Sequence, residues 1–282
     1  LNEDAPFTSI SWANNRTQIM LVNGQAGWGY VINYITNTLT QITDPDFTGG
    51  DTVVFLDTYF FYNEPGTQSM FASAINDGTN FDALDTASAE SRADNLIGLI
   101  ADKRELLAFG STTIEMWYDA ANAVGFPFSV RPGEYYDIGC SAKGSIVSID
   151  NTVFFLDHRR YITALSPDNG LNILSPPWLR NKITSYSRVD DAEAYAFEDA
   201  GQLMYIINFP NEGITWAYDL TTQQFHERAY WGAGAVEFTR HRVSCCSKYK
   251  QHYIAGDFSN GNIYLYGHQF KDDYGQQIRR LF

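Results

Sequence analysis

Paired carboxylates are the first groups in this sequence that could do chemistry. They stand at Asp44 and Asp46, at Asp190 and Asp191, and at Asp272 and Asp273. Glycoside hydrolysis needs two carboxylates that converge on the scissile bond, and only the fold decides that convergence. The nearest approach to a bladed glycosidase signature, Ser166-Pro-Asp-Asn-Gly170, occurs once and lacks the Trp that would complete it. The acids alone therefore do not predict an enzyme.

The histidines and cysteines form no metal or nucleophile pattern. The sequence has no Cys-x-x-Cys spacing for zinc, and each of the five histidines is typical of a surface or strand position. The three cysteines include the adjacent pair Cys245 and Cys246, which cannot build a disulfide scaffold, so we expect small buried hydrophobes. Nucleophile elbows, phosphate loops and dinucleotide fingerprints are missing from the sequence. We therefore expect no catalytic residue, no metal site and no cofactor. The histidines are His158, His226, His241, His252 and His268.

Positive charge is scarce and gathers in two short clusters, His158-Arg159-Arg160 and Ile278-Arg279-Arg280. Such clusters are typical of solvated turns or ion-pair partners; the alternative is contact with an acidic neighbouring subunit. The chain has 19 basic and 33 acidic residues, a net charge of −14. Because binding to nucleic acid or anionic lipid depends on Lys and Arg, this charge disfavours a polyanion-binding groove. The sequence also has no apolar run of about 18 residues that would span a membrane.

The elements that position these residues are predicted to be β-strands. Aromatic residues make up 15% of the chain, which favours sheet over helix. Short apolar runs occur in pairs near Asn, Asp or Gly, which is typical of β-hairpins. The six pairs are 19–22 with 30–32, 59–62 with 70–72, 106–109 with 114–117, 153–156 with 161–163, 204–207 with 215–218 and 252–255 with 263–266.

The hairpins recur at a nearly constant spacing. Turn residues that close the first runs are separated by 40, 47, 47, 51 and 49 residues: Asn23, Asn63, Gly110, Asp157, Asn208 and Asp257. Propeller blades repeat every 40 to 50 residues or so, whereas sandwiches and barrels lack such a long period. A third strand precedes most hairpins, and outer strands are predicted at 38–42, 128–130, 171–174 and 223–227. The sequence predicts an all-β fold, a β-propeller with six recognisable hairpin blades, almost no helix, and incomplete first and last blades. Four side chains are expected to be buried between blades: Trp117, Trp216, Phe155 and Ile207.

We assign residues 1–270 to the propeller and residues 271–282 to the start of a C-terminal extension.

Two stretches of the chain depart from the regular hairpin pattern. Residues 72–95 are polar and acidic and are interpreted as a long excursion between blades. Residues 125–139 combine four aromatics with two prolines, and two interpretations stay open: an outer strand with a packed corner, or a docking loop for a neighbour. We expect both stretches to leave the propeller body and touch other chains. Because interface cores are enriched in aromatics and Arg, the candidate interface residues are Phe126, Phe128, Arg131, Tyr135, Tyr136, Arg159 and Arg160.

Residues 106–119, LLAFGSTTIEMWYD, together with Gly125, Ile138-Gly139, Gly144-Ser145 and 155–161, resemble the packaged-DNA stabilisation proteins, or tail hub proteins, of short-tailed phages and their prophages. Residues 40–47, 88–92 and 94–95 are similar to the same family. The resemblance covers essentially the whole chain, and Phe-Gly-Ser-Thr-Thr-Ile-Glu at 109–115 is its most specific part. The family's usual N-terminal segment and the region after Ile-Arg-Arg are missing, so their roles are not carried over. The start, Leu1-Asn2-Glu3-Asp4, has no initiator Met and no signal peptide, so we expect this chain to begin inside a longer protein.

The resemblance implies a virion structural protein without catalysis or cofactor. It would be a tail hub or nozzle component that extends the DNA channel below the portal and adaptor, seals the packaged DNA and supports the needle and receptor-binding spikes. Its implied partners are copies of itself in a ring, with six the expected number, the portal and adaptor proteins, the tail needle, and tailspike or fibre proteins. DNA would pass through without tight binding. The protein would be made in the bacterial host cytoplasm and reside in the phage tail. The alternative is a carbohydrate-binding or glycan-cleaving propeller of a tail fibre.

Overall fold

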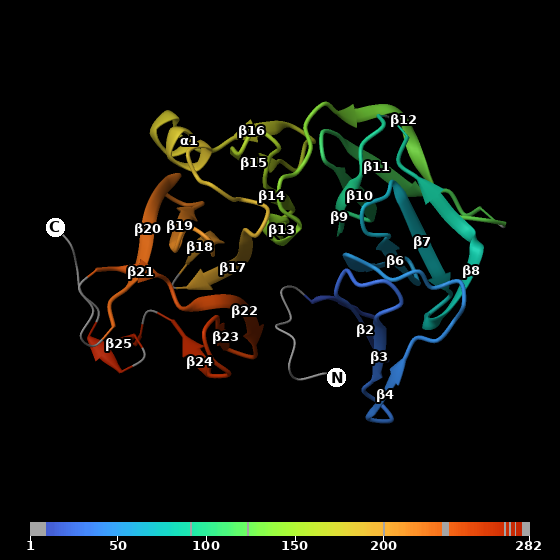
Figure 1. Ribbon diagram of the computed structural model, residues 1–282, viewed down its shortest axis with the longest axis horizontal. Coiled ribbons are helices and arrows are strands. Elements are labelled where there is room, and N and C mark those ends of the chain that lie inside the picture. Colours follow the sequence, from blue (N-terminus) through green and yellow to red (C-terminus); the bar gives the residue numbers. More distant parts are fainter. Residues whose placement is uncertain are drawn as a thin grey trace. The chain divides into compact units, whose positions relative to one another are not determined.

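The computed structural model describes residues 10–90, 92–122, 124–199, 201–232, 237–267, 269–270, 272–273 and 275–277. The chain forms two compact units, Leu1–Ser141 and Ala142–Phe282. In Figure 1 the first unit runs from blue to green, and the second from yellow-green to red.

The first unit contains three antiparallel sheets of four strands, each with its strands in chain order. The first sheet is β1 (Ser11–Asn14), β2 (Gln18–Val22), β3 (Gly29–Asn33) and β4 (Thr38–Gln41). The second is β5 (Val53–Leu56), β6 (Tyr59–Asn63), β7 (Ser69–Ala74) and β8 (Asp77–Ser88). The third is β9 (Leu96–Asp102), β10 (Glu105–Gly110), β11 (Ile114–Asp119) and β12 (Phe128–Tyr136).

The second unit continues the pattern with sheets of four, five and three strands. The fourth sheet is β13 (Val147–Ile149), β14 (Thr152–Leu156), β15 (Ile162–Leu165) and β16 (Leu171–Ile173), preceded by the short 3-10 helix η1 (Lys143–Ser145) and followed by α1 (Pro177–Thr184). The fifth is β17 (Glu193–Asp199), β18 (Gln202–Phe209), β19 (Ile214–Asp219), β20 (Gln224–Tyr230) and β21 (Thr239–Arg240). The sixth is β22 (Val243–Tyr249), β23 (His252–Asp257) and β24 (Ile263–Tyr266), and β25 (Asp272–Asp273) pairs with β26 (Gln276–Gln277).

All six predicted hairpins are present, and β4, β12, β16 and β20 begin within one residue of the predicted outer strands. Tight turns within the sheets use left-handed backbone, with φ of 43° at Asp57, 48° at Lys103 and 48° at Asp150. Asp and Asn tolerate that conformation, which is why turn chemistry located the strands so well. Within the described ranges the last sheet has three strands, as expected of an incomplete blade, whereas the first sheet has four, so it is complete, contrary to prediction.

Residues 72–95 were predicted to leave the sheets, and this prediction is wrong. Most of them form β8, the outer strand of the second sheet, which pairs with β7. Phe81 points inward and packs on Phe47 and Tyr62, at ring-centroid distances of 5.3 and 5.4 Å. On and just after β8, Asp82 and Glu90 are exposed, and Asp77 and Asp85 are half-buried, which an edge strand of an antiparallel sheet tolerates. Pairing with β7 is interrupted after Phe81, so residues 82–85 form a bulge.

For residues 125–139 the outer-strand interpretation is right, because β12 is the fourth strand of the third sheet. Phe126 and Phe128 are 7% and 2% exposed, and their ring centroids lie 5.4 and 4.8 Å from that of Phe61 in the second sheet. Both side chains therefore pack in the core of their own unit, and their contact with other chains stays a prediction. The cause is physical: an outer strand still has one face turned toward the neighbouring sheet, and apolar side chains there become core.

Apolar cores fill the spaces between consecutive sheets within each unit. The core between the first and second sheets includes Phe60, and that between the second and third includes Trp117. In the second unit, Trp216 lies between the fourth and fifth sheets and Phe197 between the fifth and sixth. The predicted burial is confirmed, since four side chains are 7% exposed or less: Trp117, Trp216, Phe155 and Ile207.

Buried polar side chains stand within one residue of the end of the second strand in several sheets. Asn63 and Asn208 are fully buried there, and Asp157 and Asp257 have fully buried side chains. Each accepts hydrogen bonds from its own sheet; the Oδ1 of Asn208, for example, accepts one from Thr215 Oγ1 at 2.7 Å. Because an unpaired buried polar group costs about 1–3 kcal/mol, these bonds are what allow the turn residues to lie inside.

Related hydrogen bonds cross from one sheet to the next. The Leu99 backbone N–H of the third sheet donates to Thr52 Oγ1 beside the second, at 2.8 Å. Asn208 Nδ2 of the fifth sheet donates to the Val243 carbonyl of the sixth, at 3.0 Å. Such directional bonds fix how adjacent sheets align, whereas the hydrophobic effect between them is non-directional.

The phrase at 109–115 that carries the family resemblance forms a turn around one carboxylate. Asp94 accepts hydrogen bonds from the backbone N–H and the hydroxyl of both Thr112 and Thr113, at 2.6 to 3.0 Å. A Cβ on Gly110 would lie 2.5 Å from Asp94 Oδ2, so glycine alone fits beside that carboxylate. The most specific motif of the sequence therefore has a structural explanation.

Replacing Asn208 by Ala tests the inter-sheet bonds. The variant N208A leaves Thr215 Oγ1 and the Val243 carbonyl without this buried partner, so we expect it to lower the free energy of unfolding by about 2 kcal/mol in urea titrations. The control is N181A, an exposed position on α1 where we expect almost no change. Equal unfolding midpoints for both variants would contradict the role assigned to Asn208.

The Asp257 side chain predicts a specific acid sensitivity. Burial acts to raise the pKa of Asp257, but hydrogen bonds from Tyr264, Ser259 and Arg242 outweigh it and lower the pKa to about 2. Because the folded-state pKa lies below the unfolded value of about 3.9, this carboxylate stabilises the fold above pH 4 or so and loses that effect as the pH falls toward 2. We expect the difference in melting temperature between the wild type and D257N to be large at pH 7 and to shrink below pH 4. A difference that stays constant to pH 2 would refute this.

Candidate protein-interaction sites

The predicted interface residue Arg159 is one of two arginines whose guanidinium groups lie over the ring of Tyr161. The guanidinium carbons of Arg159 and Arg180 lie 5.1 and 5.2 Å from the Tyr161 ring centroid. Asp157 Oδ2 accepts hydrogen bonds from Nε and Nη2 of Arg159, at 3.1 and 2.6 Å. The Asp157 side chain is fully buried, while 43% of the Arg159 side chain is exposed. The carboxylate thus lies inside the turn and the guanidinium reaches the surface.

Arg160, also a predicted interface residue, holds the end of α1. Its Nη1 donates to the carbonyl oxygens of Thr184 and Tyr186, at 3.1 and 2.7 Å. The C-terminus of a helix has free carbonyl groups and a partial negative charge, so a cation is favoured there. Arg160 therefore has a structural role in its own unit, whatever it contacts beyond it.

Exposed apolar side chains lie on α1 and on β16, the strand that precedes it. Trp178 on α1 is 53% exposed and packs edge-on against Trp216, with ring centroids 5.5 Å apart. Leu171 and Ile173 on the outer strand β16 are 36% and 45% exposed. The sequence analysis missed α1, because its eight residues are too few for a helical period to stand out. Trp178 and Arg180 stand two residues apart on α1 and contact Trp216 and Tyr161 respectively, so they lie on different sides of the helix.

The three remaining predicted interface residues lie on β12. Arg131 is engaged within its own sheet, since its Nη2 donates to Glu105 Oε1 at 2.5 Å and its guanidinium stacks 5.5 Å from the Tyr118 ring centroid. Tyr135 is 46% exposed and Tyr136 is half-buried. The structure thus leaves both tyrosines near the surface, and their contact with other chains stays a prediction.

A second exposed apolar surface lies on the outer strand β8, in the bulge of the second sheet. Leu84 and Val124 are 73% and 87% exposed. A Cβ on Gly125 would lie 3.6 Å from the Leu84 carbonyl oxygen, so the β11–β12 connection adjoins the bulge. The acids Asp82 and Asp85 flank Leu84, and Asp82 Oδ1 accepts a hydrogen bond from the Leu84 N–H at 2.9 Å. We name these four residues, Asp82, Leu84, Asp85 and Val124, the β8 edge.

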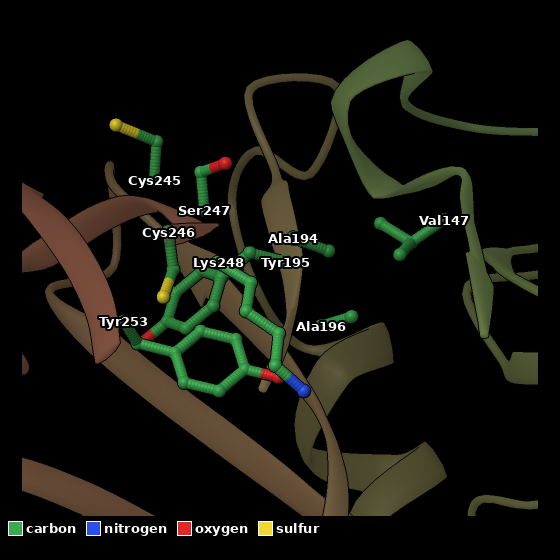
Figure 2. Close-up of a pocket in the computed structure, with 9 residues that line it drawn as sticks. All are labelled: Val147, Ala194, Tyr195, Ala196, Cys245, Cys246, Ser247, Lys248 and Tyr253. Atoms are coloured by element: carbon green, nitrogen blue, oxygen red, sulfur yellow. The ribbon is translucent and has the colours of Figure 1, made fainter. Parts of the chain in front are cut away.

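A hollow of about 450 Å³ lies in the second unit between β13, β17, β22 and β23, and Figure 2 shows the side chains that line it. Cys245 and Ser247 point to the opposite side of β22 from Cys246. Burial, reinforced by Cys245, raises the pKa of Cys246 to about 12, so this thiol stays protonated and is a poor nucleophile at neutral pH. Cys140 is buried as predicted, whereas Cys245 is exposed, contrary to prediction. The lining residues are Val147, Ala194, Tyr195, Ala196, Cys245, Cys246, Ser247, Lys248 and Tyr253.

His241 departs from the predicted surface or strand position, because it is buried between β21 and β22. Burial, and next the charge of Arg228, lower its pKa to about 3, so the imidazole is neutral. Its Nδ1 lies 3.5 Å from the Tyr195 hydroxyl, inside the core.

Over the described ranges, no group of three or more His, Cys, Asp or Glu could hold a metal ion. His268 and the cluster at 278–280 lie outside the described residues.

Comparison with solved structures finds propeller-like proteins of low sequence identity. BamB from Moraxella catarrhalis is 12% identical with a TM-score of 0.53, over 97% of this chain and 75% of its own. Dihydro-heme d1 dehydrogenase NirN is 9% identical with a TM-score of 0.58, over 91% of this chain and 53% of its own. Such identities show a shared fold alone. In the part of the chain that the structure describes, no helix has the length and apolarity to cross a membrane.

The family comparison is more specific. No curated protein sequence matches the chain. Residues 5–269, however, match the phage stabilisation family model, described as bacteriophage P22 Gp10, β-propeller. This match confirms the predicted fold class and the resemblance seen in the sequence. The chain is therefore a bacteriophage structural protein that belongs to the P22 Gp10 stabilisation family of β-propellers.

Proposed function

We propose that this chain is a tail hub or nozzle component of a short-tailed phage. Copies of it form a ring below the portal and adaptor, extend the DNA channel, seal the packaged DNA and support the needle and the receptor-binding spikes. The observation that carries this proposal is the family match over residues 5–269. The role is mechanical, and the protein is not an enzyme.

The physical character of the subunit supports a mechanical role. A wall around a DNA exit must keep its shape when it is loaded from inside. Here the sheets are joined by apolar cores and also by directional bonds such as that from Asn208 to the Val243 carbonyl. Close-packed interiors of this kind have low compressibility, which suits a subunit that transmits force.

The net charge supports passage of DNA without tight binding. Each phosphate contact needs a cation, and this chain has 33 acidic against 19 basic residues. Acidic residues along a channel would repel the duplex over a Debye length, about 8 to 10 Å at physiological salt. DNA would then slide past a wall that does not hold it.

Disruption of the gene for this chain tests the proposed role. We expect infected cells to produce heads that package DNA and then lose it, because the exit is not sealed, and we expect a plasmid copy to restore stable particles. Particle images should place the protein on the tail axis at the portal vertex. Density at the periphery, with stable filled heads in the mutant, would refute the hub and favour the glycan-binding fibre.

A DNA-binding titration tests the charge argument separately. The purified protein and a labelled duplex at about 50 mM salt should give a dissociation constant weaker than micromolar, because few cations are available to displace counterions. Micromolar or tighter binding that weakens steeply as salt rises would contradict the proposed sliding passage.

A further inference from the structure

The sixth sheet ends at its third strand among the described residues. In the first five sheets the third strand pairs on its outer side with a fourth: β3 with β4, β7 with β8, β11 with β12, β15 with β16 and β19 with β20. In the sixth sheet β24 pairs with β23 and, within the ranges that the structure describes, with no further strand. The outer edge of β24 is therefore open at the place where the other sheets have a fourth strand.

The register shows which backbone groups face this edge. The Asp257 N–H donates to the Asn262 carbonyl at 3.2 Å, so these two residues form a hydrogen-bonded pair between β23 and the start of β24. Hydrogen-bonded and non-hydrogen-bonded pairs alternate along an antiparallel ladder, so Ile263 and Leu265 are in non-hydrogen-bonded pairs with β23. The N–H and C=O groups of Ile263 and Leu265 therefore point away from β23, toward the outer edge.

The residues of β24 are typical of a covered strand. Its sequence, Ile-Tyr-Leu-Tyr, has no charge and no proline, yet Ile263 and Leu265 are 74% and 56% exposed. The third strand β15, with the sequence Ile-Thr-Ala-Leu, is also uncharged and is fully buried. The longer outer strands β8, β12 and β20 each have charged residues. An exposed apolar edge without charge or proline is a template for another strand.

Side-chain contacts hold β24 in place from the opposite face. The Tyr264 hydroxyl donates to Asp257 Oδ2 at 2.6 Å. The Tyr266 ring centroid lies 4.2 Å from that of Phe197 on β17, and the Tyr266 hydroxyl accepts a hydrogen bond from Arg228. A partner strand would therefore meet a preformed edge, and little conformational freedom of this chain would be lost on binding.

The chemistry of the edge defines what can bind there. An extended strand satisfies outward N–H and C=O groups together, and the exposed Ile263 and Leu265 favour apolar side chains at alternate positions of that strand. Residues 258–267 contain no charged side chain, so the edge selects for no charge. The strands that follow in this chain, β25 and β26, pair with one another, so we assign the occupant to a different chain.

We propose that the outer edge of β24 binds an extended, apolar and uncharged segment of another protein chain as the fourth strand of the sixth sheet. The segment pairs antiparallel with Ile263 and Leu265, which is the direction of every third-to-fourth strand pair in the other five sheets. This inference goes beyond the proposed hub and does not depend on it, because it rests on the sixth sheet alone.

A peptide titration tests the proposal. The probe is a fluorescent peptide of residues 36–43, TNTLTQIT, which is uncharged and contains β4, the fourth strand of the first sheet. Its binding to the full chain is followed by anisotropy at peptide-binding concentrations up to about 1 mM. The variant L265P lacks one outward N–H, and proline is tolerated on an edge strand, so we expect it to weaken binding about tenfold. The control L265V keeps the N–H and an apolar side chain and should bind as the wild type does.

A modified peptide keeps the proposal falsifiable if L265P does not fold, which its melting temperature shows. The same peptide with N-methyl groups on Thr38, Leu39, Thr40 and Gln41 cannot donate to the edge, so we expect it not to bind. The absence of saturable binding by the unmodified peptide would overturn the proposal. Equal binding by folded L265P, or by the methylated peptide, would also overturn it. The proposed hub would stand in each case.

Hydrogen exchange separates the possible occupants of the edge. In the full chain alone, the amides of Ile263 and Leu265 should exchange quickly, and the peptide should slow their exchange. Slow exchange without peptide at every protein concentration would mean that the chain covers its own edge. Slow exchange that develops only as the protein concentration rises would assign the edge to a second copy. Either result would overturn the assignment to a segment of a different protein.

Discussion

The central strands of the second and fifth sheets are covered on both faces by neighbouring sheets of their own unit, and much of the structure follows from this constraint. In β18 burial is continuous from Met204 to Phe209, and in β14 of the fourth sheet the run from Val153 to Leu156 is also buried without a break. A strand covered on both sides cannot expose the polar residues that close its turn. Those residues must find hydrogen bonds inside, as Asp157 does with Arg159 and as Asn208 does with Thr215.

The same constraint explains how the few basic residues are distributed. Arg242 binds the buried Asp257, and Arg159 binds the buried Asp157, so arginines are drawn to the turns where carboxylates have been taken out of water. A buried carboxylate that kept no such partner would be strongly unfavourable. What remains for the surface is an excess of acids.

Outer strands escape the constraint, because one of their edges and much of one face meet solvent. They can therefore hold acids, bulges and exposed apolar residues at little cost to the fold. The bulge at residues 82–85 and the exposed Leu171 and Ile173 of β16 both lie on such strands. Variation on the outer strands changes what the subunit can contact and leaves the inter-sheet cores intact.

The sequence by itself determined the all-β class, the six hairpins, their period and the positions of most outer strands, because turn chemistry and alternation act over only a few residues. It also determined the family, through a phrase whose glycine and threonines surround Asp94. Only the tertiary structure decided which side chains face a neighbouring sheet. Phe126 and Phe128 read as interface aromatics yet lie in the core, His241 is sealed inside, and Leu84 and Trp178 stand exposed. The physical reason is that burial of a side chain depends on what covers it, and the covering sheet comes from residues some 40 to 50 positions away in the chain.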